Sequence, residues 1–148
     1  MNFMIKKNIE EWSKHPFCDE TQKELNLLKQ SEDKLIDAFY KNLEFGTGGM
    51  RGLMGVGTNR INKYTIGKNT QGISNFINHQ NKLPKRAVIA YDCRKNSDTL
   101  AKIVADIFSA NGIQVFLFSS LRPTPELSFA VKKLNCSCGI VLTASHNP

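Results

Sequence analysis

The second half of the sequence alternates between strand patterns and helix patterns, and this alternation constrains the fold more than any other feature. Residues 87–91 form a short apolar run that predicts a buried strand. Apolar residues spaced three and four positions apart then predict a helix that is capped by Ser97 and ends at Asn111-Gly112. The pattern continues with a strand over 113–118, a helix with Thr124 as its cap and Pro125 as its first residue, and a strand over 139–142.

This order of elements, with short connections between them, predicts an α/β fold with a βαβαβ core. Right-handed crossovers turn such a core into a three-layer α/β/α sandwich with a mainly parallel (mixed) sheet. Ligands bind such sheets at the carboxyl ends of the strands. Two polar loops leave those ends, over 92–97 and 143–148, so we expect the functional site there.

The first part of the chain has helix patterns, which predicts a helical N-terminal extension over 1–44. The α/β domain then occupies 45–148 and is expected to be truncated just after its last loop. One helix of the extension is predicted to start at Ser31 and to stop near Gly46, and a helix of the domain is predicted over 63–79. The apolar residues expected on one face are Leu35, Ile36, Phe39, Tyr40 and Leu43 in the first helix and Ile66, Ile73, Phe76 and Ile77 in the second.

Composition narrows the classes of protein to which the chain can belong. With 148 residues, of which 41% are hydrophobic, it can bury a core without a disulfide or a metal ion. The sequence has neither a membrane-spanning stretch nor a signal peptide, which predicts a cytoplasmic protein with no membrane partner. Its 20 basic and 13 acidic residues give a net charge of +7, which suits an anionic ligand. The basic residues are scattered, which disfavours a nucleic-acid partner.

The four cysteines do not have the spacing of a metal site. Cys18, Cys93, Cys136 and Cys138 contain no Cys-x-x-Cys pair, which argues against a zinc site and against a secreted disulfide framework. We therefore expect reduced thiols in the core.

Glycine is concentrated in one segment, where six of the ten glycines lie between Gly46 and Gly57. Glycine lets backbone amides approach an anion closely, and Arg51 within the segment can bind a phosphate through two hydrogen bonds. The spacing fits neither of the two common nucleotide-binding fingerprints. Two interpretations follow from the residues alone: a phosphate-binding loop, or a glycine-rich turn and edge strand without a ligand.

Ser145 follows the third predicted strand and is a candidate nucleophile. It lacks the Gly-x-Ser-x-Gly elbow of acyl-transfer enzymes, and its immediate neighbour His146 is poorly placed to form a triad with it. A serine that accepts a phosphoryl group needs only charge neutralisation, an in-line hydroxyl and a nearby acid or base. The alternative is that Ser145 and His146 merely cap a following turn.

Four segments, in this order, resemble domain I of the phosphoglucomutase/phosphomannomutase family of phosphohexomutases. That resemblance favours the phosphoryl-accepting serine, and it implies the sandwich fold already predicted. It also implies an isomerase of carbohydrate metabolism that interconverts sugar 1-phosphate and sugar 6-phosphate through a phosphoserine and a bisphosphorylated sugar. The segments that carry the resemblance are Phe45–Gly52, Tyr91–Arg94 with Ser97, Pro123–Val131, and Thr143–Pro148.

The resemblance also assigns roles to individual residues. Ser145 would be the phosphoserine, and His146 would lie beside it as a hydrogen-bond donor or proton carrier. Mg²⁺ would bind an oxygen of the Ser145 phosphate, and glucose 1,6-bisphosphate or an equivalent sugar bisphosphate would act as activator. The residues implied to bind the sugar phosphate or its phosphate groups are Arg51, Thr47, Gly48, Gly49 and Asn147.

The family's metal loop, sugar-selecting loop and distal phosphate loop belong to later domains, which are therefore the implied partners of this chain. The choice among glucose, mannose and pentose phosphates belongs to those domains too, and the 148 residues alone are expected to be inactive. Residues 135–138 depart from the family pattern just before the third strand. Two other hypotheses stay open, a catalytically inactive phosphate-binding or regulatory module of the same fold and a basic nucleic-acid-binding domain.

Overall fold

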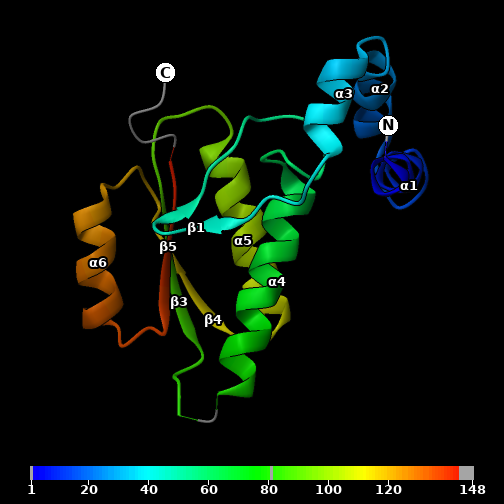
Figure 1. Cartoon of the computed structure of the whole chain (residues 1–148). Coiled ribbons are helices and arrows are strands. Elements are labelled where there is room, and N and C mark those ends of the chain that lie inside the picture. The colour runs from blue at the N-terminus through cyan, green and yellow to red at the C-terminus, as the bar shows by residue number, and fades with distance from the viewer. Residues whose placement is uncertain (1, 81, 144–148) are drawn as a thin grey trace. The chain divides into compact units, whose positions relative to one another are not determined.

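A computed structural model describes residues 2–80 and 82–143 of the chain. These residues form two compact units, 1–65 and 66–148, and the division falls within helix α4 (Lys63–His79) (Figure 1). The helix has the bounds that its periodicity predicts. The predicted domain division after residue 44 stays a prediction.

A parallel three-stranded sheet forms the centre of unit 66–148. Strand β3 (Arg86–Tyr91) lies in the middle, with β4 (Gln114–Leu117) and β5 (Cys138–Leu142) on either side. Both neighbours run parallel to β3, and Val88 pairs with Phe116 on one side and with Gly139 on the other. The predicted parallel sheet is confirmed. The strands are parallel because two helical crossovers return the chain to the same end of the sheet each time.

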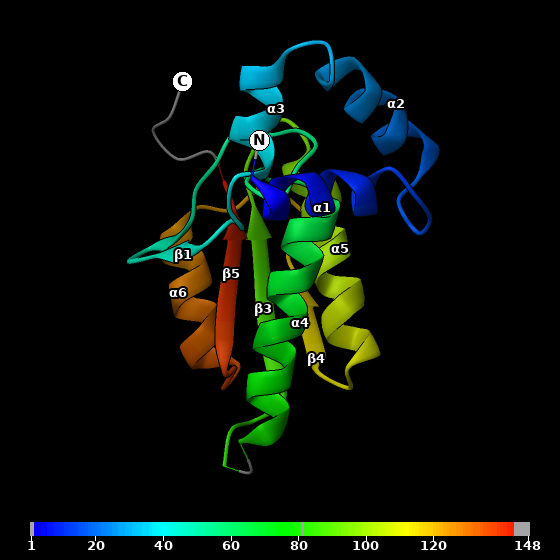
Figure 2. The same ribbon diagram turned by 45° about the vertical axis from the view of Figure 1, so that its right-hand side comes forward.

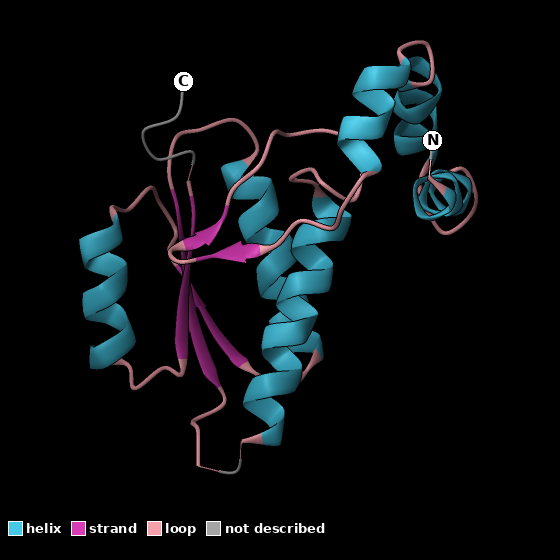
Figure 3. Cartoon of the chain, in the orientation of Figure 1, coloured by secondary structure: helices cyan, strands magenta, loops and turns pink. Residues whose placement is uncertain are grey.

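Helices cover both faces of this sheet. Helix α5 (Ser97–Ala110) packs on one face and α6 (Thr124–Lys133) on the opposite face (Figures 1 and 2). The part of α4 in this unit lies on the same side as α5 (Figures 1 and 3), where Ile107 comes close to Gly67. The three-layer α/β/α arrangement is confirmed. Its largest fully buried apolar side chains are Ile77, Val88, Ile89, Val104, Phe108 and Ile113.

Both sheet-covering helices begin differently from the prediction. Asn96 is the N-cap residue of α5, with a left-handed φ of 64°, and Ser97 is the first helical residue. The Ser97 hydroxyl turns back to the carboxylate of Asp92 at 3.0 Å, so it does not cap the helix. Likewise Pro123 is the N-cap residue of α6, and Thr124 is already helical. Each helix therefore starts one residue earlier than predicted. In α5 the reason is the contact of Ser97 outside the helix, and in α6 it is the fixed φ of proline.

Helix α4 buries a different set of residues from the predicted apolar stripe. Ile66 and Ile77 are buried as expected, but Phe76 keeps 61% of its surface exposed. Thr70 and Ser74 are buried instead, and each hydroxyl donates to the backbone carbonyl four residues earlier, Thr70 at 2.9 Å and Ser74 at 2.8 Å. Because these bonds satisfy both hydroxyls within the helix, small polar residues fit the buried face without an unpaired group.

The described part of unit 1–65 contains three complete helices, the first residues of α4 and a short hairpin. Trp12 lies in its core and stacks on Phe17 with the ring centroids 4.5 Å apart, and Phe39 and Tyr64 meet the indole edge-on. The predicted helix after Ser31 ends at Phe39 and not near Gly46, so Tyr40 and Leu43 are not part of it. The elements are α1 (Phe3–Trp12), α2 (Asp19–Leu28), α3 (Glu32–Phe39), β1 (Phe45–Gly46) and β2 (Gly49–Met50).

The expectation that the cysteines are core thiols is wrong. All four are free, but Cys93 is exposed and the other three are only half-buried. Cys18 precedes α2, and its sulfur lies 3.0 Å from the Lys63 ammonium and 3.3 Å from the Thr21 hydroxyl. Hydrogen bonding with Thr21, then with Tyr64 and Lys63, lowers the pKa of the Cys18 thiol to about 7.

We therefore expect iodoacetamide to alkylate Cys18 at pH 7 well before it alkylates Cys138. The thiolate is the reactive form, and burial raises the pKa of the Cys138 thiol to about 11. Peptide mass spectrometry over a pH series should show the rate at Cys18 falling as the pH drops below 7, because the thiolate becomes protonated. Lys63→Met removes one stabilising contact and should slow the reaction at pH 7. Equal rates at Cys18 and Cys138 would contradict this assignment.

Candidate functional site

The loops that follow β3 and β5 start side by side, because these strands are neighbours. Tyr91 pairs with Leu142 at the carboxyl end of both strands, so Asp92 and Thr143 are the first residues beyond the sheet. The hydroxyl of Thr143 donates to Oδ2 of Asp92 at 2.5 Å, and the Asp92 amide donates to the carbonyl of Leu142 at 3.2 Å. Two polar segments that are far apart in the sequence are thus joined at this edge of the sheet.

The carboxylate of Asp92 is the centre of this junction. Its Oδ1 atom accepts hydrogen bonds from the Arg94 amide and the Ser97 hydroxyl, both at 3.0 Å. Burial alone would raise the pKa of Asp92, but the hydrogen bonds from Thr143, Arg94 and Ser97, together with the Arg94 charge, outweigh it and lower the pKa. Asp92 is therefore an anion at neutral pH, with both oxygens engaged.

The glycine-rich segment forms a hairpin in unit 1–65. Strands β1 and β2 pair antiparallel, with Gly46 opposite Gly49, and Thr47 and Gly48 form the turn between them. Gly49 has a φ of 133°, a backbone conformation that residues with a Cβ atom rarely adopt. A Cβ atom added to Gly48 or Gly49 would meet nothing within 4 Å, so the space beside both backbones is open. The hairpin can therefore bring its backbone close to a ligand.

Two other glycines of the segment lie close to neighbouring residues. A Cβ atom on Gly57 would lie 2.4 Å from the carbonyl oxygen of Ala38, and one on Gly52 would lie 2.9 Å from the Leu43 side chain. The close approach of Gly57 to α3 leaves room only for hydrogen. Packing therefore requires glycine at position 57, whereas positions 48 and 49 lie at an open turn.

Arg51 directly follows the hairpin and is exposed. Within the described part of the chain, its guanidinium forms no ion pair with a carboxylate. Arg60, by contrast, pairs with Asp37 through Nη2 and Oδ2 at 2.5 Å and is engaged in holding the loop to α3. Of these two arginines, Arg51 is the one with an uncommitted charge beside the glycine turn.

The predicted site residues fall into two groups. Thr47, Gly48, Gly49 and Arg51 lie together in or beside the hairpin of unit 1–65. Ser145, His146 and Asn147 lie outside the described residues. Sequence reasoning assigned no role to Asp92. The spacing Asp-x-x-x-x-Ser at the start of a helix was the available signal, since an aspartate there can accept hydrogen bonds from both the loop and the serine.

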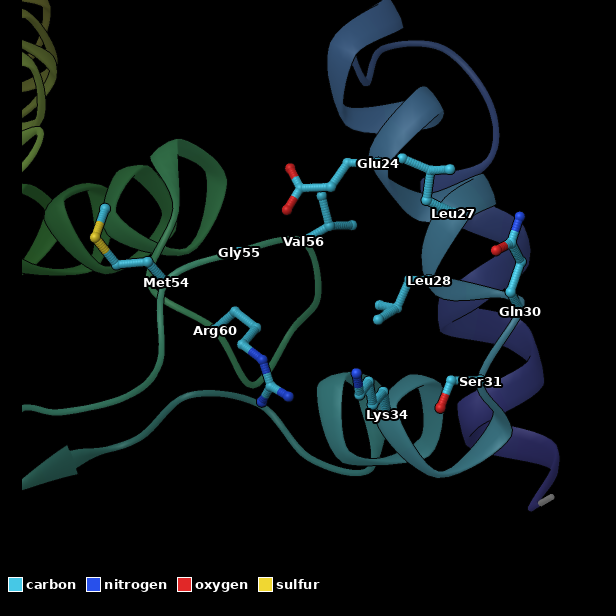
Figure 4. A pocket seen from close by; sticks show the side chains of 10 residues that line it. All are labelled: Glu24, Leu27, Leu28, Gln30, Ser31, Lys34, Met54, Gly55, Val56 and Arg60. Carbon is cyan, nitrogen blue, oxygen red and sulfur yellow. The ribbon is translucent and has the colours of Figure 1, made fainter.

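A pocket of about 420 Å³ lies elsewhere in unit 1–65, between α2, α3 and residues 54–60 (Figure 4). No residue of the glycine hairpin is among the described residues that line it, and the paired Arg60 contributes to its wall. It is therefore separate from the candidate phosphate loop. Its lining residues are Glu24, Leu27, Leu28, Gln30, Ser31, Lys34, Met54, Gly55, Val56 and Arg60.

Residues 2–80 and 82–143 contain no group of three or more histidines, cysteines or acidic residues that could hold a metal ion. None of the helices described there is both long enough and apolar enough to cross a membrane.

The family match and the most similar relatives of this chain agree with each other. Residues 42–148 match the family described as phosphoglucomutase/phosphomannomutase, alpha/beta/alpha domain I. A phosphoglucomutase of Staphylococcus aureus strain USA300 is 43% identical over 120 residues, which cover 81% of this chain and 22% of that protein. The phosphoglucomutase of the bovine strain RF122 / ET3-1 is 44% identical over 120 residues, with the same coverage of 81% and 22%. This chain therefore spans 22% of the length of these curated relatives. No solved structure matches it.

Proposed function

Because the chain belongs to the phosphoglucomutase/phosphomannomutase family, as its domain I, we propose that it supplies the phosphorylated serine of a sugar-phosphate mutase. The observation that carries this proposal is the family match over 42–148, which includes both the glycine hairpin and the Ser145 segment. The full-length enzyme would interconvert a sugar 1-phosphate and a sugar 6-phosphate. Sugar phosphates are anions, in keeping with the net charge of +7.

The reaction consists of two phosphoryl transfers, the first from the serine to the sugar and the second from the sugar back to the serine. In the first, a free hydroxyl oxygen of the sugar monophosphate bonds to the phosphorus on Ser145, and the bond between that phosphorus and the serine oxygen breaks. The sugar hydroxyl loses its proton to a base. In the second, the bisphosphorylated sugar has turned round, and the serine oxygen bonds to the phosphorus of its other phosphoryl group. The bond between that phosphorus and its sugar oxygen breaks, and the sugar oxygen takes up a proton to become a hydroxyl. The enzyme ends as it began, and the phosphate has changed position on the sugar.

The hairpin and the Ser145 segment would share the task of charge neutralisation. Arg51 has an exposed guanidinium that can form two hydrogen bonds to one phosphate group, and the backbone at Gly48 and Gly49 is open to a ligand. Thr47 would add a hydroxyl donor. His146 and Asn147, the two residues that follow Ser145 in the sequence, would donate hydrogen bonds to the phosphate, and His146 would also carry a proton.

The remaining parts of the enzyme would complete the site. Mg²⁺ would bind an oxygen of the Ser145 phosphate and neutralise charge there. The described residues do not supply a set of carboxylates for it, so we propose that its other protein ligands come from the rest of the full-length enzyme. A sugar bisphosphate such as glucose 1,6-bisphosphate would load Ser145 with phosphate. We further propose a helical extension over 1–44, domain I over 45–148, and a cytoplasmic location without nucleic-acid or membrane partners.

The test is a mutase assay on the full-length enzyme and on the 148-residue chain. With glucose 1-phosphate, glucose 1,6-bisphosphate and Mg²⁺, we expect the full-length enzyme to form glucose 6-phosphate and the chain alone to form none. Phosphoryl transfer depends on positioning and charge neutralisation, and Mg²⁺ prefers six oxygen ligands. Residues 2–80 and 82–143 contain no cluster of carboxylates to supply them.

Three results would contradict parts of this proposal. Turnover by the chain alone would refute the multi-domain site. A full-length enzyme that binds sugar phosphate but never phosphorylates Ser145 would indicate the inactive phosphate-binding module. Binding to DNA that weakens steeply with salt, in place of sugar-phosphate turnover, would indicate a nucleic-acid-binding domain.

A further inference from the structure

We propose that Asp92 is a positioning residue of this reaction, which holds the start of the Ser145 segment in place through Thr143. The inference rests on the proposed function, since it assumes that Ser145 carries the transferred phosphate. It concerns a residue that need not touch the substrate: Asp92 would act on the reaction through the backbone that leads to Ser145. Thr143 lies two residues before Ser145 in the sequence.

The contacts of Asp92 come from two different elements. On one side, Oδ1 binds the Arg94 amide and the hydroxyl of Ser97, which is the first residue of α5 and only 5% exposed. On the other side, Oδ2 accepts the Thr143 hydroxyl at 2.5 Å. The carboxylate therefore links the N-terminal end of α5 to the first residue after β5.

The backbone around this link is also fixed. Tyr91 pairs with Leu142 in the sheet, and the Asp92 amide donates to the Leu142 carbonyl at 3.2 Å. Sheet pairing thus positions the chain up to Leu142, and the Asp92 carboxylate extends the anchorage by one residue, to Thr143. A hydrogen bond to an ionised carboxylate is about twice as strong as one between neutral groups.

Precise placement matters because the phosphoryl group must lie in line with the attacking hydroxyl. A displacement of about 1 Å can reduce the rate by about a hundredfold. A link that fixes the chain two residues before the nucleophile should thus affect kcat more than KM, since substrate contacts through Arg51 stay intact.

The test uses the full-length enzyme with Thr143→Val, which removes the hydroxyl and keeps the branched shape. We expect kcat to fall by about tenfold to a hundredfold while KM changes less than about twofold, and the rate of Ser145 phosphorylation by glucose 1,6-bisphosphate to fall in parallel. Thr143→Ser, which restores the hydroxyl, should recover kcat to within about threefold of wild type. Thr99→Val makes the same chemical change at an exposed position of α5 and should leave both constants unchanged.

A second variant separates the link from a general loss of structure. Asp92→Asn removes the charge that Thr143 binds. We expect the double variant, Asp92→Asn with Thr143→Val, to be no slower than the slower single variant, because both substitutions act on the same hydrogen bond between Thr143 and Asp92. Independent, multiplicative effects would overturn the proposal, as would wild-type kcat in Thr143→Val or failure of Thr143→Ser to restore it. Ser145→Ala distinguishes a failure of the proposed function from a failure of the role of Asp92. Full activity in that variant refutes the proposed function and this inference with it, whereas an inactive Ser145→Ala beside a normal Thr143→Val refutes only the role of Asp92.

Discussion

Replacing Ser145 with alanine in the full-length enzyme should abolish phosphoryl uptake from glucose 1,6-bisphosphate and lower turnover by about 10⁴-fold or more. The reason is that both half-reactions use the serine oxygen, first as leaving group and then as acceptor, and alanine has no oxygen to offer. Intact-mass measurement should show wild-type enzyme heavier by one phosphate and the variant unmodified. Turnover of glucose 1-phosphate is the second readout.

A matched control separates this effect from any loss of structure. Ser109→Ala makes the same change on the exposed side of α5 and should keep both phosphoryl uptake and turnover. Far-ultraviolet circular dichroism should show the same helix content in both variants, since strand β5 ends at Leu142 and the substituted Ser145 lies beyond it. Substantial turnover in Ser145→Ala would refute the phosphoserine mechanism.

Arg51→Lys should lower kcat/KM by about tenfold to a thousandfold, which corresponds to about 1.4 to 4 kcal/mol of transition-state stabilisation. Lysine keeps the positive charge but lacks the planar pair of donors that binds two phosphate oxygens at once. The melting temperature should change little, because the Arg51 side chain is exposed and forms no ion pair within the described residues.

Arg86→Lys is the control for this substitution. Arg86 is exposed at the amino end of β3, the end of the strand opposite Asp92, so the same change there should leave the kinetics within about twofold of wild type. If Arg51→Lys shows wild-type kinetics, or if Arg86→Lys is equally impaired, Arg51 has no special role in binding phosphate.

Much of the α/β unit was predictable because its signals are local. A buried strand such as β3 needs only a short apolar run, and α5 needs only apolar residues three and four positions apart. Gly112 ends the turn after α5 with a φ of 72°, as the Asn-Gly pair predicts. Helix starts were less predictable, because a side chain such as Ser97 can bond to a residue outside the helix as readily as it can cap it.

The candidate site was predictable in its residue types and less so in its connections. The glycine segment and the Ser145 motif stand out in the sequence and carry the family resemblance that the comparisons confirm. The sequence does not distinguish a glycine required by packing from one at an open turn. Gly57 has a φ of 134° and lies against Ala38 of another element, whereas a Cβ atom added to Gly48 would meet nothing within 4 Å.

The sequence by itself therefore determined the order of strands and helices in the α/β unit, its parallel sheet and the family, since periodicity and motifs depend on neighbouring residues. Only the tertiary structure decided which side chains meet. Asp92 and Thr143 are 51 residues apart and touch because β3 and β5 are adjacent and end at the same edge of the sheet. Phe76 fits the apolar stripe of α4 yet stays exposed, while Ser74 is buried. The reason is that the position of neighbouring elements determines which face of the helix is buried. Local patterns carry no record of such distant partners, which hydrophobic burial and strand pairing bring together.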